Sequence, residues 1–528
     1  MKFKLFYNAV IYSLDSDRIF DWMLVFGDRI AALGQTGDLP DLPDSLMEKI
    51  DLDGRTVIPS FTDAHTHFAS TALYEGQISL HNAESLDDAI KILTDKKNKF
   101  LPGEWVTGGG YDRNLWEDGQ PHRKYLDKIF PVNPVALDSK DGHALWVNTE
   151  ALKRAGIGPH TSDQDGGKIV RDQDGRLTGV LYESAMLPVK KLYDETIREK
   201  LSGYIENLYP KFYRLGITSV HTMETWQDFN SFQMLYKSGQ LKMRINMYLP
   251  QEDMEKLISA RIRSGFGNEW IRVAGVKFFV DGSLGSQTAE MTQPYENSEN
   301  YFGIGVMSEK DLTERIQLAL RNGLACAVHA IGDRAVNKAV NAFEKGHSWQ
   351  EQFKLTNRIE HAQLILPTDI VRLAKLNIIA SMQPLHIADD VEIAELHWGV
   401  RSGFAYPMRA LADAGVVLAF GSDVPVADPD PFKGIYTAVL RKYRVNPNAK
   451  SWHPERAVTL REALSAYTTG GALASDEIKN KGTLLPGKLA DFIVLSKDVF
   501  KIPVEEILDL MVELTVLGGE VVFDKRNL

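Results

Sequence analysis

Disulfide-forming residues, long apolar runs and an excess of basic charge are all missing from this chain of 528 residues. Its one cysteine, Cys326, excludes an internal disulfide framework and fits a reducing compartment. The longest apolar stretches, such as 415–420 and 378–382, are far shorter than the roughly 20 residues that span a bilayer. A net charge of −11 without a basic patch argues against nucleic acid as a partner. We therefore expect a soluble, cytoplasmic protein with neither a membrane nor a nucleic acid as its partner.

Both ends of the chain are predicted to form β-strands. Aromatic and β-branched residues mark these strands at 3–14, 22–26, 30–33, 50–58, 491–495, 514–517 and 521–523. A Gly518-Gly519 turn joins the last two. Because the sequence between the two ends is rich in helices, we expect one small β-sandwich built from 1–58 and 479–528. The alternative is two separate β appendages.

Between these ends, eight apolar runs alternate with helical patterns such as 309–322 and 333–345. The runs are 58–68, 217–223, 244–249, 273–280, 324–330, 357–362, 377–383 and 416–423. Eight buried parallel strands that alternate with helices are typical of a (β/α)8 barrel. The predicted fold class is therefore α/β, with a TIM-like barrel domain over 59–478.

The interval between the first run and the second is far longer than one strand–helix connection needs. Residues from about 69 to 205 are therefore predicted to form an insertion after the first barrel strand. A loop at that point emerges on the carboxyl face of the barrel, where such folds place their active sites. We expect the insertion to act as a lid or as part of a substrate pocket.

Candidate metal ligands lie at the ends of five of the eight runs. His65 and His67 end the first run, and because alternate strand residues point to one face, they can bind one metal ion together. This pattern alone is weak, since two polar residues at a strand end are common. Single candidates end or follow four later runs: Lys277, His329, His361 and Asp423. Scattered structural residues would not gather on one face, so the set predicts a metal site.

Strand alternation also predicts which way Lys277 points. It places Lys277 on the same face as Val273, Gly275, Phe279 and Asp281. A lysine directed into a barrel is costly unless it is neutralised or paired. The alternative is a lysine that extends to the barrel mouth.

These residues resemble the metal-dependent amidohydrolase superfamily and, within it, the amidohydrolase-3 group. The motifs that carry the resemblance are 63–67 (DAHTH), 141–143 (DGH), 275–285 (GVKFFVDGSLG), 329–335 (HAIGDRA), 359–361 (IEH) and 420–425 (FGSDVP). The resemblance extends along nearly the whole chain. It implies a distorted barrel with a split β-sandwich, which agrees with the strand pattern.

The resemblance also implies a ligand set. It suggests His65, His67 and Asp423 on one divalent metal and His329 and His361 on a second, with a carboxylated Lys277 between them. Other members hold one metal and no carboxylated lysine, so we expect one or two ions per chain. Nitrogen and oxygen ligands suit zinc, and such a metal makes hydroxide available at neutral pH. Asp423 would then act as the proton shuttle.

The expected reaction is the hydrolysis of a non-peptide carbon–nitrogen bond, in an amide, N-acyl or cyclic imide group of a small molecule. Candidate substrate-binding residues are His143, His221, Tyr111 and Asp281, with Asp112 and Glu183 as weaker ones. For Asp281, a hydrogen bond that orients a ligand is an equal alternative. His386 and His397 flank a predicted loop after the seventh strand, and either could line the mouth of the site.

Three alternatives to this function stay open on sequence grounds. The same metal site could deaminate a heterocycle or hydrolyse an ester, because a fold does not fix its chemistry. The chain could also be a regulatory or binding protein that retains the fold without catalysis. The oligomeric state is open as well, with a homo-oligomer as one of the alternatives.

Overall fold

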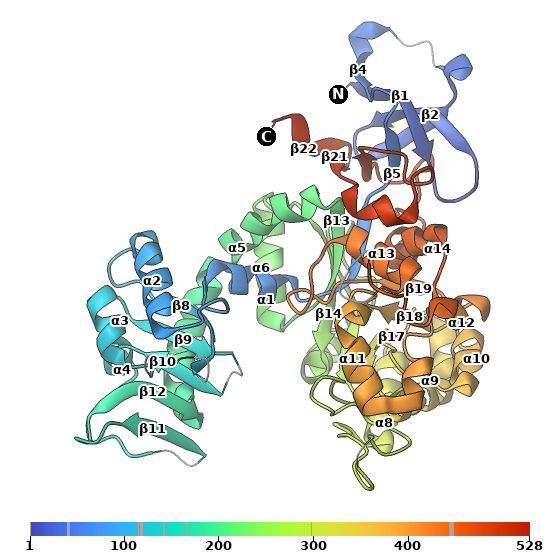
Figure 1. The fold of residues 1–528 in the computed structure, drawn as a ribbon. Helices are drawn as coiled ribbons and strands as arrows, with labels where there is room; N and C mark the ends of the chain where they lie inside the picture. The colour runs from blue at the N-terminus through green and yellow to red at the C-terminus, as the bar shows by residue number, and fades with distance from the viewer. Residues whose placement is uncertain are drawn as a thin grey trace. The chain divides into compact units, whose positions relative to one another are not determined.

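The computed structural model describes residues 2–39, 43–113, 116, 120–140, 143–163, 166–296, 298–442 and 448–527. These residues form two compact units (Figure 1). The first unit contains Met1–Phe68 and Leu208–Leu528, and the second contains Ala69–Asn207. Asp141 and Gly142, which precede His143 in the sequence motif, lie outside the described residues.

The centre of the first unit is a parallel barrel, as the eight apolar runs predict. Its strands pair in chain order and are β6 (Phe61–Thr66), β13 (Ile217–Met223), β14 (Arg244–Pro250), β15 (Ile271–Phe279), β16 (Cys326–Ala330), β17 (Arg358–His361), β18 (Ile379–Met382) and β19 (Leu418–Phe420). A parallel bridge between Thr66 and Val424 brings the last strand beside the first. Nearly every strand residue is buried, which explains their continuous apolar character.

The first predicted run, 58–68, divides between two sheets. Thr56–Pro59 forms β5, which belongs to the sheet of the chain ends, and Phe61–Thr66 forms the barrel strand β6. Ser60 separates them, with its hydroxyl 2.6 Å from that of Thr218. The prediction of one continuous strand over 50–58 is also wrong, because a turn separates β4 (Met47–Asp51) from β5. The turn contains Asp53 and Gly54, both with positive φ, a conformation that ends a strand.

Helices follow the barrel strands and alternate with them. They are α6 (Trp226–Lys237), α7 (Met254–Ser259), α8 (Glu309–Arg321), α9 (Asp333–Phe353), α10 (Pro367–Lys375), α11 (His386–Trp398), α12 (Met408–Asp413), α13 (Pro431–Leu440), α14 (Leu460–Ser465) and α15 (Gly471–Ala474). The predicted helix 309–322 matches α8, whereas α9 continues well beyond residue 345. Within the described residues, no helix combines the length and apolar character of a membrane span.

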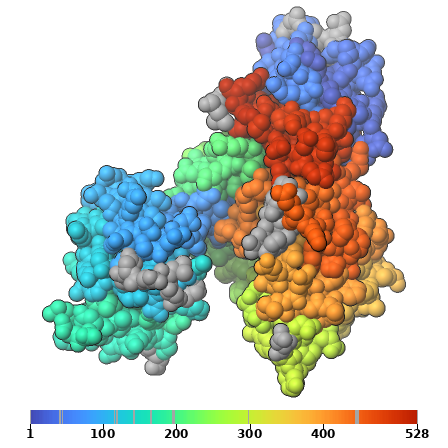
Figure 2. Space-filling view, viewed as in Figure 1, coloured from blue at the N-terminus to red at the C-terminus, as the bar shows by residue number. Residues whose placement is uncertain are grey.

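Strands from both ends of the chain form one sheet in the first unit (Figure 1). Figure 2 shows the N-terminal and C-terminal segments of this unit side by side. Its described members are β1 (Phe3–Tyr12), β2 (Ile19–Phe26), β3 (Arg29–Gly34), β4, β5, β20 (Phe492–Leu495), β21 (Val512–Leu517) and β22 (Glu520–Asp524). β5 joins the two ends, because it pairs with β1 on one side and with β20 on the other. Phe6, Val57, Phe492 and Val516 are buried in one hydrophobic cluster of this sheet.

A buried ion pair connects this sheet to the barrel. Arg244, the first residue of β14, donates from Nε to Asp491 at 2.6 Å, and both side chains are almost fully buried. The guanidinium also donates to the carbonyl of Glu269. Breaking such a pair leaves an uncompensated buried charge, so the contact holds the strand end in place.

The second unit has a sheet of its own. Its described strands are β7 (Ile78–Ser79), β8 (Val106–Tyr111), β9 (Val135–Ser139), β10 (Ala144–Val147), β11 (Gly167–Arg171) and β12 (Leu177–Glu183). Its helices are α2 (Leu86–Lys96), α3 (Arg123–Ile129) and α4 (Thr149–Arg154), while α1 (Phe68–Gly76) and α5 (Leu187–Arg214) contain the unit boundaries. The insertion therefore has an apolar core of its own, which includes Leu137, Leu145 and Trp146.

Candidate metal centre

One cavity collects every metal ligand that the sequence predicts. The cavity has a volume of about 540 Å³ and opens at the carboxyl ends of the barrel strands. Its lining includes His65, His67, Lys277, His329, His361 and Asp423. All of these side chains except His67 are at least nine-tenths buried. The predicted convergence of residues far apart in sequence is therefore present in the fold.

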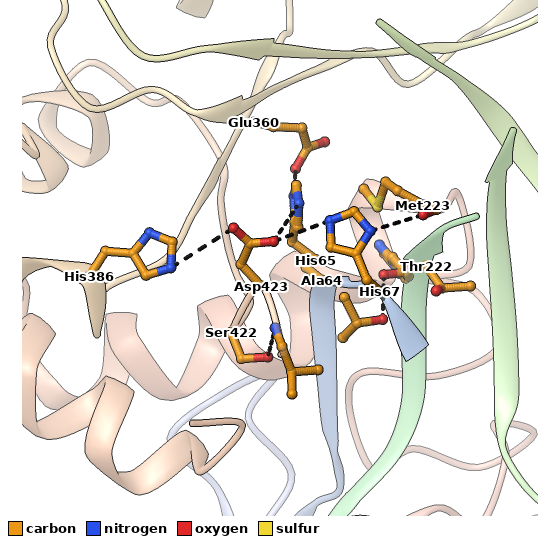
Figure 3. Close-up of polar contacts among 12 residues, drawn as sticks. Ala64, His65, His67, Thr222, Met223, Glu360, His386, Ser422 and Asp423 are labelled. Atoms are coloured by element: carbon orange, nitrogen blue, oxygen red, sulfur yellow. Dashed lines mark hydrogen bonds and ion pairs between the residues drawn. The ribbon is translucent and has the colours of Figure 1, made fainter. Parts of the chain in front are cut away.

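Asp423 is at the centre of this group (Figure 3). Its Oδ1 lies 3.3 Å from Nε2 of His65 and 3.3 Å from Nε2 of His67. Ligand atoms of His65, His361 and Asp423 all lie within 4.8 Å of one another. The ring of His329 has its centroid 4.5 Å from that of His361. The tightest group therefore takes residues from both of the ligand sets that the resemblance suggests.

Unusual backbone angles direct two of these side chains into the cavity. His361 has a φ of 69° and Asp423 a φ of 64°, in the left-handed region that residues other than glycine rarely adopt. Such strain is often found at functional sites, where the surrounding structure holds it. Gly421 is needed nearby, because a Cβ at that position would lie 2.4 Å from the backbone nitrogen of His65.

Hydrogen bonds fix which nitrogen each histidine presents. Nδ1 of His65 donates to Glu360 at 2.5 Å, and Nδ1 of His67 donates to the carbonyl of Met223 at 3.0 Å, so both present Nε2 to Asp423 (Figure 3). Nε2 of His329 donates to the carbonyl of Gly282 at 3.0 Å, which leaves Nδ1 as its ligand atom. Nδ1 of His361 is buried and has no hydrogen-bond partner among the described residues.

The donor set fits a divalent metal. Burial lowers the pKa of His329 to about 3 and holds that of His361 well below its ordinary value, so both rings stay neutral with a lone pair available. Burial opposes ionisation of Asp423, but His65 and His67 keep the pKa of this carboxyl well below its ordinary value. Neutral imidazoles with an ionised carboxylate are the ligands that zinc and its neighbours take in proteins.

Glu360 and Arg358 orient His65, and neither was assigned a role from the sequence. Arg358 donates to both carboxylate oxygens of Glu360, to the carbonyl of Ala64 and to Nδ1 of His221. All of these side chains are fully buried. Burial raises the pKa of Glu360, but Arg358 and His65 outweigh it and hold the pKa well below its ordinary value. Two charged residues alternating in a buried strand were the signal that could have revealed this pair.

Lys277 points into the same cavity, as strand alternation predicts. It is 3% exposed, and its Nζ lies 4.8 Å from the centroid of the Phe279 ring. Burial lowers the pKa of Lys277 to about 8, although Glu360 and Asp423 act in the opposite direction. A lysine with a lowered pKa has a larger neutral fraction, which is the form that reacts as a nucleophile.

Asp281 and His221, both predicted to contact substrate, are not among the described residues that line the cavity. The carboxylate of Asp281 accepts hydrogen bonds from the backbone nitrogens of Glu290, Ile331 and Gly332. It therefore organises the segments that follow β15 and β16. His221 is fully buried and accepts from Arg358.

The remaining predicted substrate residues share a cavity of the second unit. This cavity has a volume of about 470 Å³, and its lining includes Tyr111, Asp112, His143 and Glu183. Nδ1 of His143 donates to Glu183 at 2.9 Å. Tyr111 is buried in the core of the unit, with its ring 5.9 Å from that of Trp146.

The segment after β18 is a helix rather than the predicted loop. His386 begins α11 and lines the cavity of the first unit, with Nε2 3.9 Å from Oδ2 of Asp423 (Figure 3). His397 lies near the other end of the same helix, with its ring 6.4 Å from that of Tyr295. Either histidine was a candidate to line the mouth of the site, and among the described residues His386 is the one that lines the cavity.

Comparison with known proteins agrees with the site. The model of the amidohydrolase family matches residues 48–523. The chain belongs to the amidohydrolase family. This amidohydrolase is 33% identical to Protein LONG AFTER FAR-RED 3 of Arabidopsis thaliana, over 93% of its own length and 86% of the relative's. It is 26% identical to an N-substituted formamide deformylase of Arthrobacter pascens, over 98% of both chains.

A solved structure resembles this amidohydrolase over nearly its whole length. It is an uncharacterized metal-dependent hydrolase from Pyrococcus horikoshii OT3, with a TM-score of 0.80 and 27% identity, covering 95% of this chain and 99% of the other. The family and this likeness agree with the donor set described above. The protein is therefore a metal-dependent hydrolase of carbon–nitrogen bonds.

Glu360→Gln is expected to weaken metal binding about 10- to 100-fold, because residues that orient a metal-binding histidine contribute that much to affinity. The amide keeps the size of the side chain but loses the charge that Arg358 and His65 share. Competition with a chromophoric chelator measures the change.

Glu477→Gln is the matched control for this measurement. Glu477 is a buried carboxylate paired with Lys481 and Arg272, and it contacts none of the ligand histidines in the described contacts. The Glu477→Gln variant should lose thermal stability and keep its metal affinity. An equal loss of affinity in both variants would show that general destabilisation is responsible.

Proposed function

We propose that this amidohydrolase cleaves an amide, N-acyl or cyclic imide bond of a small molecule, with Asp423 as the group that carries the proton. The observation that carries the proposal is the position of the Asp423 carboxylate. Its Oδ1 faces Nε2 of His65 and of His67, whereas its Oδ2 lies 3.9 Å from Nε2 of His386, which lines the same cavity. The relative that is named an N-substituted formamide deformylase supports a carbon–nitrogen bond of this class.

Zinc is the proposed metal, with two ions per chain. The two ions would be held by Lys277 as a carbamate and by five other side chains, which are His65, His67, His329, His361 and Asp423. A metal bound here would supply a water of lowered pKa and would polarise a carbonyl oxygen. The support for this proposal is the lowered pKa of His329, of His361 and of Lys277.

Carboxylation of Lys277 needs a neutral amine and carbon dioxide. The amine nitrogen forms a bond to the carbon of carbon dioxide while one C=O π bond opens to give a carboxylate oxygen. The nitrogen then passes a proton to water, which leaves a carbamate anion. Burial favours the neutral amine before the reaction. The carbamate would share the cavity with two divalent metal ions. Asp423 is the one other carboxylate among the proposed metal ligands, so attraction to the metals would stabilise the carbamate.

Asp423 can serve both halves of the proton transfer. Its Oδ2 would accept a proton from the attacking water and then donate it to the leaving nitrogen. Since the carboxylate is ionised over the neutral pH range, it is in the form that accepts a proton. The same cavity is also lined by the buried apolar side chains of Ile331 and Leu284.

The insertion is proposed to determine substrate choice. Residues 69–207 contain none of the candidate metal ligands, yet they follow directly on β6 and carry the cavity that includes Tyr111 and His143. His143→Ala and Tyr111→Phe are therefore expected to change KM or substrate preference several-fold while the bound metal stays constant.

Metal analysis and steady-state kinetics on a panel of acylated amines measure this effect. His160→Ala is the control, because His160 is exposed in the same unit and lies outside the described lining of the cavity. Loss of metal from folded His143→Ala protein would contradict the proposal that the insertion determines substrate choice and not metal binding. An unchanged KM on every substrate of the panel would do so as well.

Metal analysis coupled to a substrate screen tests the proposed function as a whole. The screen should contain N-acyl amino acids, formamides, cyclic imides, lactones and amino-substituted heterocycles. Release of a carboxylic acid from an amide or imide is the expected result. Ammonia release from a heterocycle would identify a deaminase, and turnover of lactones alone would identify an esterase. Full metal occupancy without any turnover would favour a binding protein.

A further inference from the structure

Acidic side chains from α11 line the metal cavity beyond Asp423. Asp389 and Asp390 both belong to the lining, next to His386 on the same helix. Tyr406 donates its hydroxyl hydrogen to Oδ2 of Asp390 and so fixes this carboxylate at the wall. Burial raises the pKa of Asp390, while Tyr406 and His386 oppose that rise. A carboxylate that has lost solvent in this way gains from a cationic neighbour.

Among the described lining residues, His386 is the group whose charge interaction lowers the pKa of Asp390. Of the residues that the structure describes around the cavity, Lys277 is the one lysine or arginine, and it lies at the strand ends with the metal ligands. An anionic substrate would therefore meet two carboxylates at the wall. A cationic substrate would be attracted to them.

A buried polar group independently indicates a ligand with hydrogen-bond donors. Gln363 lines the same cavity, is 3% exposed, and its Oε1 has no hydrogen-bond partner among the described residues. A buried acceptor without a partner is costly, so it gains from a donor that a ligand brings. An ammonium group carries three such donors and no acceptor.

The cavity also has apolar side chains in its lining. Phe279 is 42% exposed and Val426 is 70% exposed, and both line the cavity together with Leu284. Apolar walls with a few convergent polar groups are typical of small-molecule sites. The lining therefore suits a short alkyl or aromatic linker with a donor group at its end.

We infer that the substrate carries a cationic amine, separated by an apolar linker from the bond that is cleaved, and that Asp390, Asp389 and Gln363 bind this amine. The inference rests on the proposed function, because it names the class of substrate for the same site. It predicts a preference for acylated diamines over acylated amino acids.

Three formamides of similar length test the preference in metal-loaded enzyme. They are the monoformyl derivative of butane-1,4-diamine, which is cationic, N-pentylformamide, which is neutral, and 4-formamidobutanoate, which is anionic. The expected kcat/KM is about 10-fold higher for the cation than for the neutral compound, since a hydrogen-bonded charge contributes about that much. The anion should be the poorest substrate. Equal values, or a preference for the anion, would overturn the inference.

Asp390→Asn assigns the effect to a residue. In this variant the ratio of kcat/KM between the cationic and neutral formamides should fall toward one. Glu392→Gln is the matched control, because it removes one negative charge from an exposed position of the same helix that is not among the described lining residues. The control should keep the ratio. A ratio that survives Asp390→Asn, or that falls equally in both variants, would overturn the assignment.

A binding measurement separates this inference from the proposed function. Butylammonium chloride and butan-1-ol are titrated calorimetrically into metal-loaded protein and its Asp390→Asn variant. Butylammonium should bind more tightly than the alcohol and lose about 10-fold in affinity in the variant. If no formamide is hydrolysed but this pattern holds, the amine site stands and the proposed reaction fails. If formamides are hydrolysed without regard to charge and butylammonium does not bind, the reaction stands and the amine site fails.

Discussion

Asp423→Asn should leave the protein folded and reduce hydrolysis to near the limit of detection. Loss of a group that transfers a proton costs about 10²- to 10⁴-fold in rate, and a weakened metal ligand adds to that loss. The amide keeps the shape of the carboxylate but cannot accept the proton at Oδ2. Steady-state kinetics with metal analysis and circular dichroism on the same samples measure the effect.

Asp430→Asn provides the control for this variant. Asp430 lies in the same segment and caps the N-terminus of α13 by accepting from the backbone nitrogen of Phe432, a role that asparagine can also fill. The control should therefore retain most of the activity. Near-normal turnover of Asp423→Asn at full metal occupancy would remove this residue from the mechanism.

Lys277→Ala should lose both bound metal and activity, because the proposed carbamate supplies one of few negative charges among the ligands. The cavity left by the side chain has room for a small anion. Added formate, acetate or propionate is therefore expected to restore part of the metal content and part of the activity. Inductively coupled plasma mass spectrometry and kinetics across a carboxylate series measure the rescue.

The rescue should be specific to Lys277. The same carboxylates should not restore Asp423→Asn, in which the missing function is the proton transfer. Electron density that shows an unmodified amine at 277 beside one fully occupied metal, in protein prepared with bicarbonate and excess metal, would contradict the carbamate. A site with a single metal on His65, His67 and Asp423 would then replace the model with two ions.

The barrel was predictable because each of its strands has a recognisable local sequence pattern. Each of the eight runs is a short apolar segment, and each one overlaps a barrel strand in the structure. Alternation in such a strand also predicted that Lys277 would point into the cavity. The division of 58–68 between two sheets was not predictable, because it depends on pairing with Phe492 and its neighbours near the other end of the chain.

Contacts between distant residues account for most of what the sequence left open at the site. The ion pair of Arg358 and Glu360 lies within one strand, but its role appears only when His65 of another strand donates to Glu360. The left-handed backbone at His361 has no local sequence signal. Gln363 and Asp390 belong to segments whose patterns predict only ordinary polar positions, and the cavity between them exists only in the folded barrel.

The pairing of β5 constrains the order in which the protein can be completed during synthesis. One edge of this strand is covered as soon as β1 is available, whereas the other edge waits for β20, which the ribosome adds only after the entire barrel. Until then the backbone donors and acceptors of that edge are available to other chains. The nascent protein therefore has an unpaired, aggregation-prone strand edge during nearly all of its translation. We expect its folding to depend on a low concentration of nascent chains or on a chaperone.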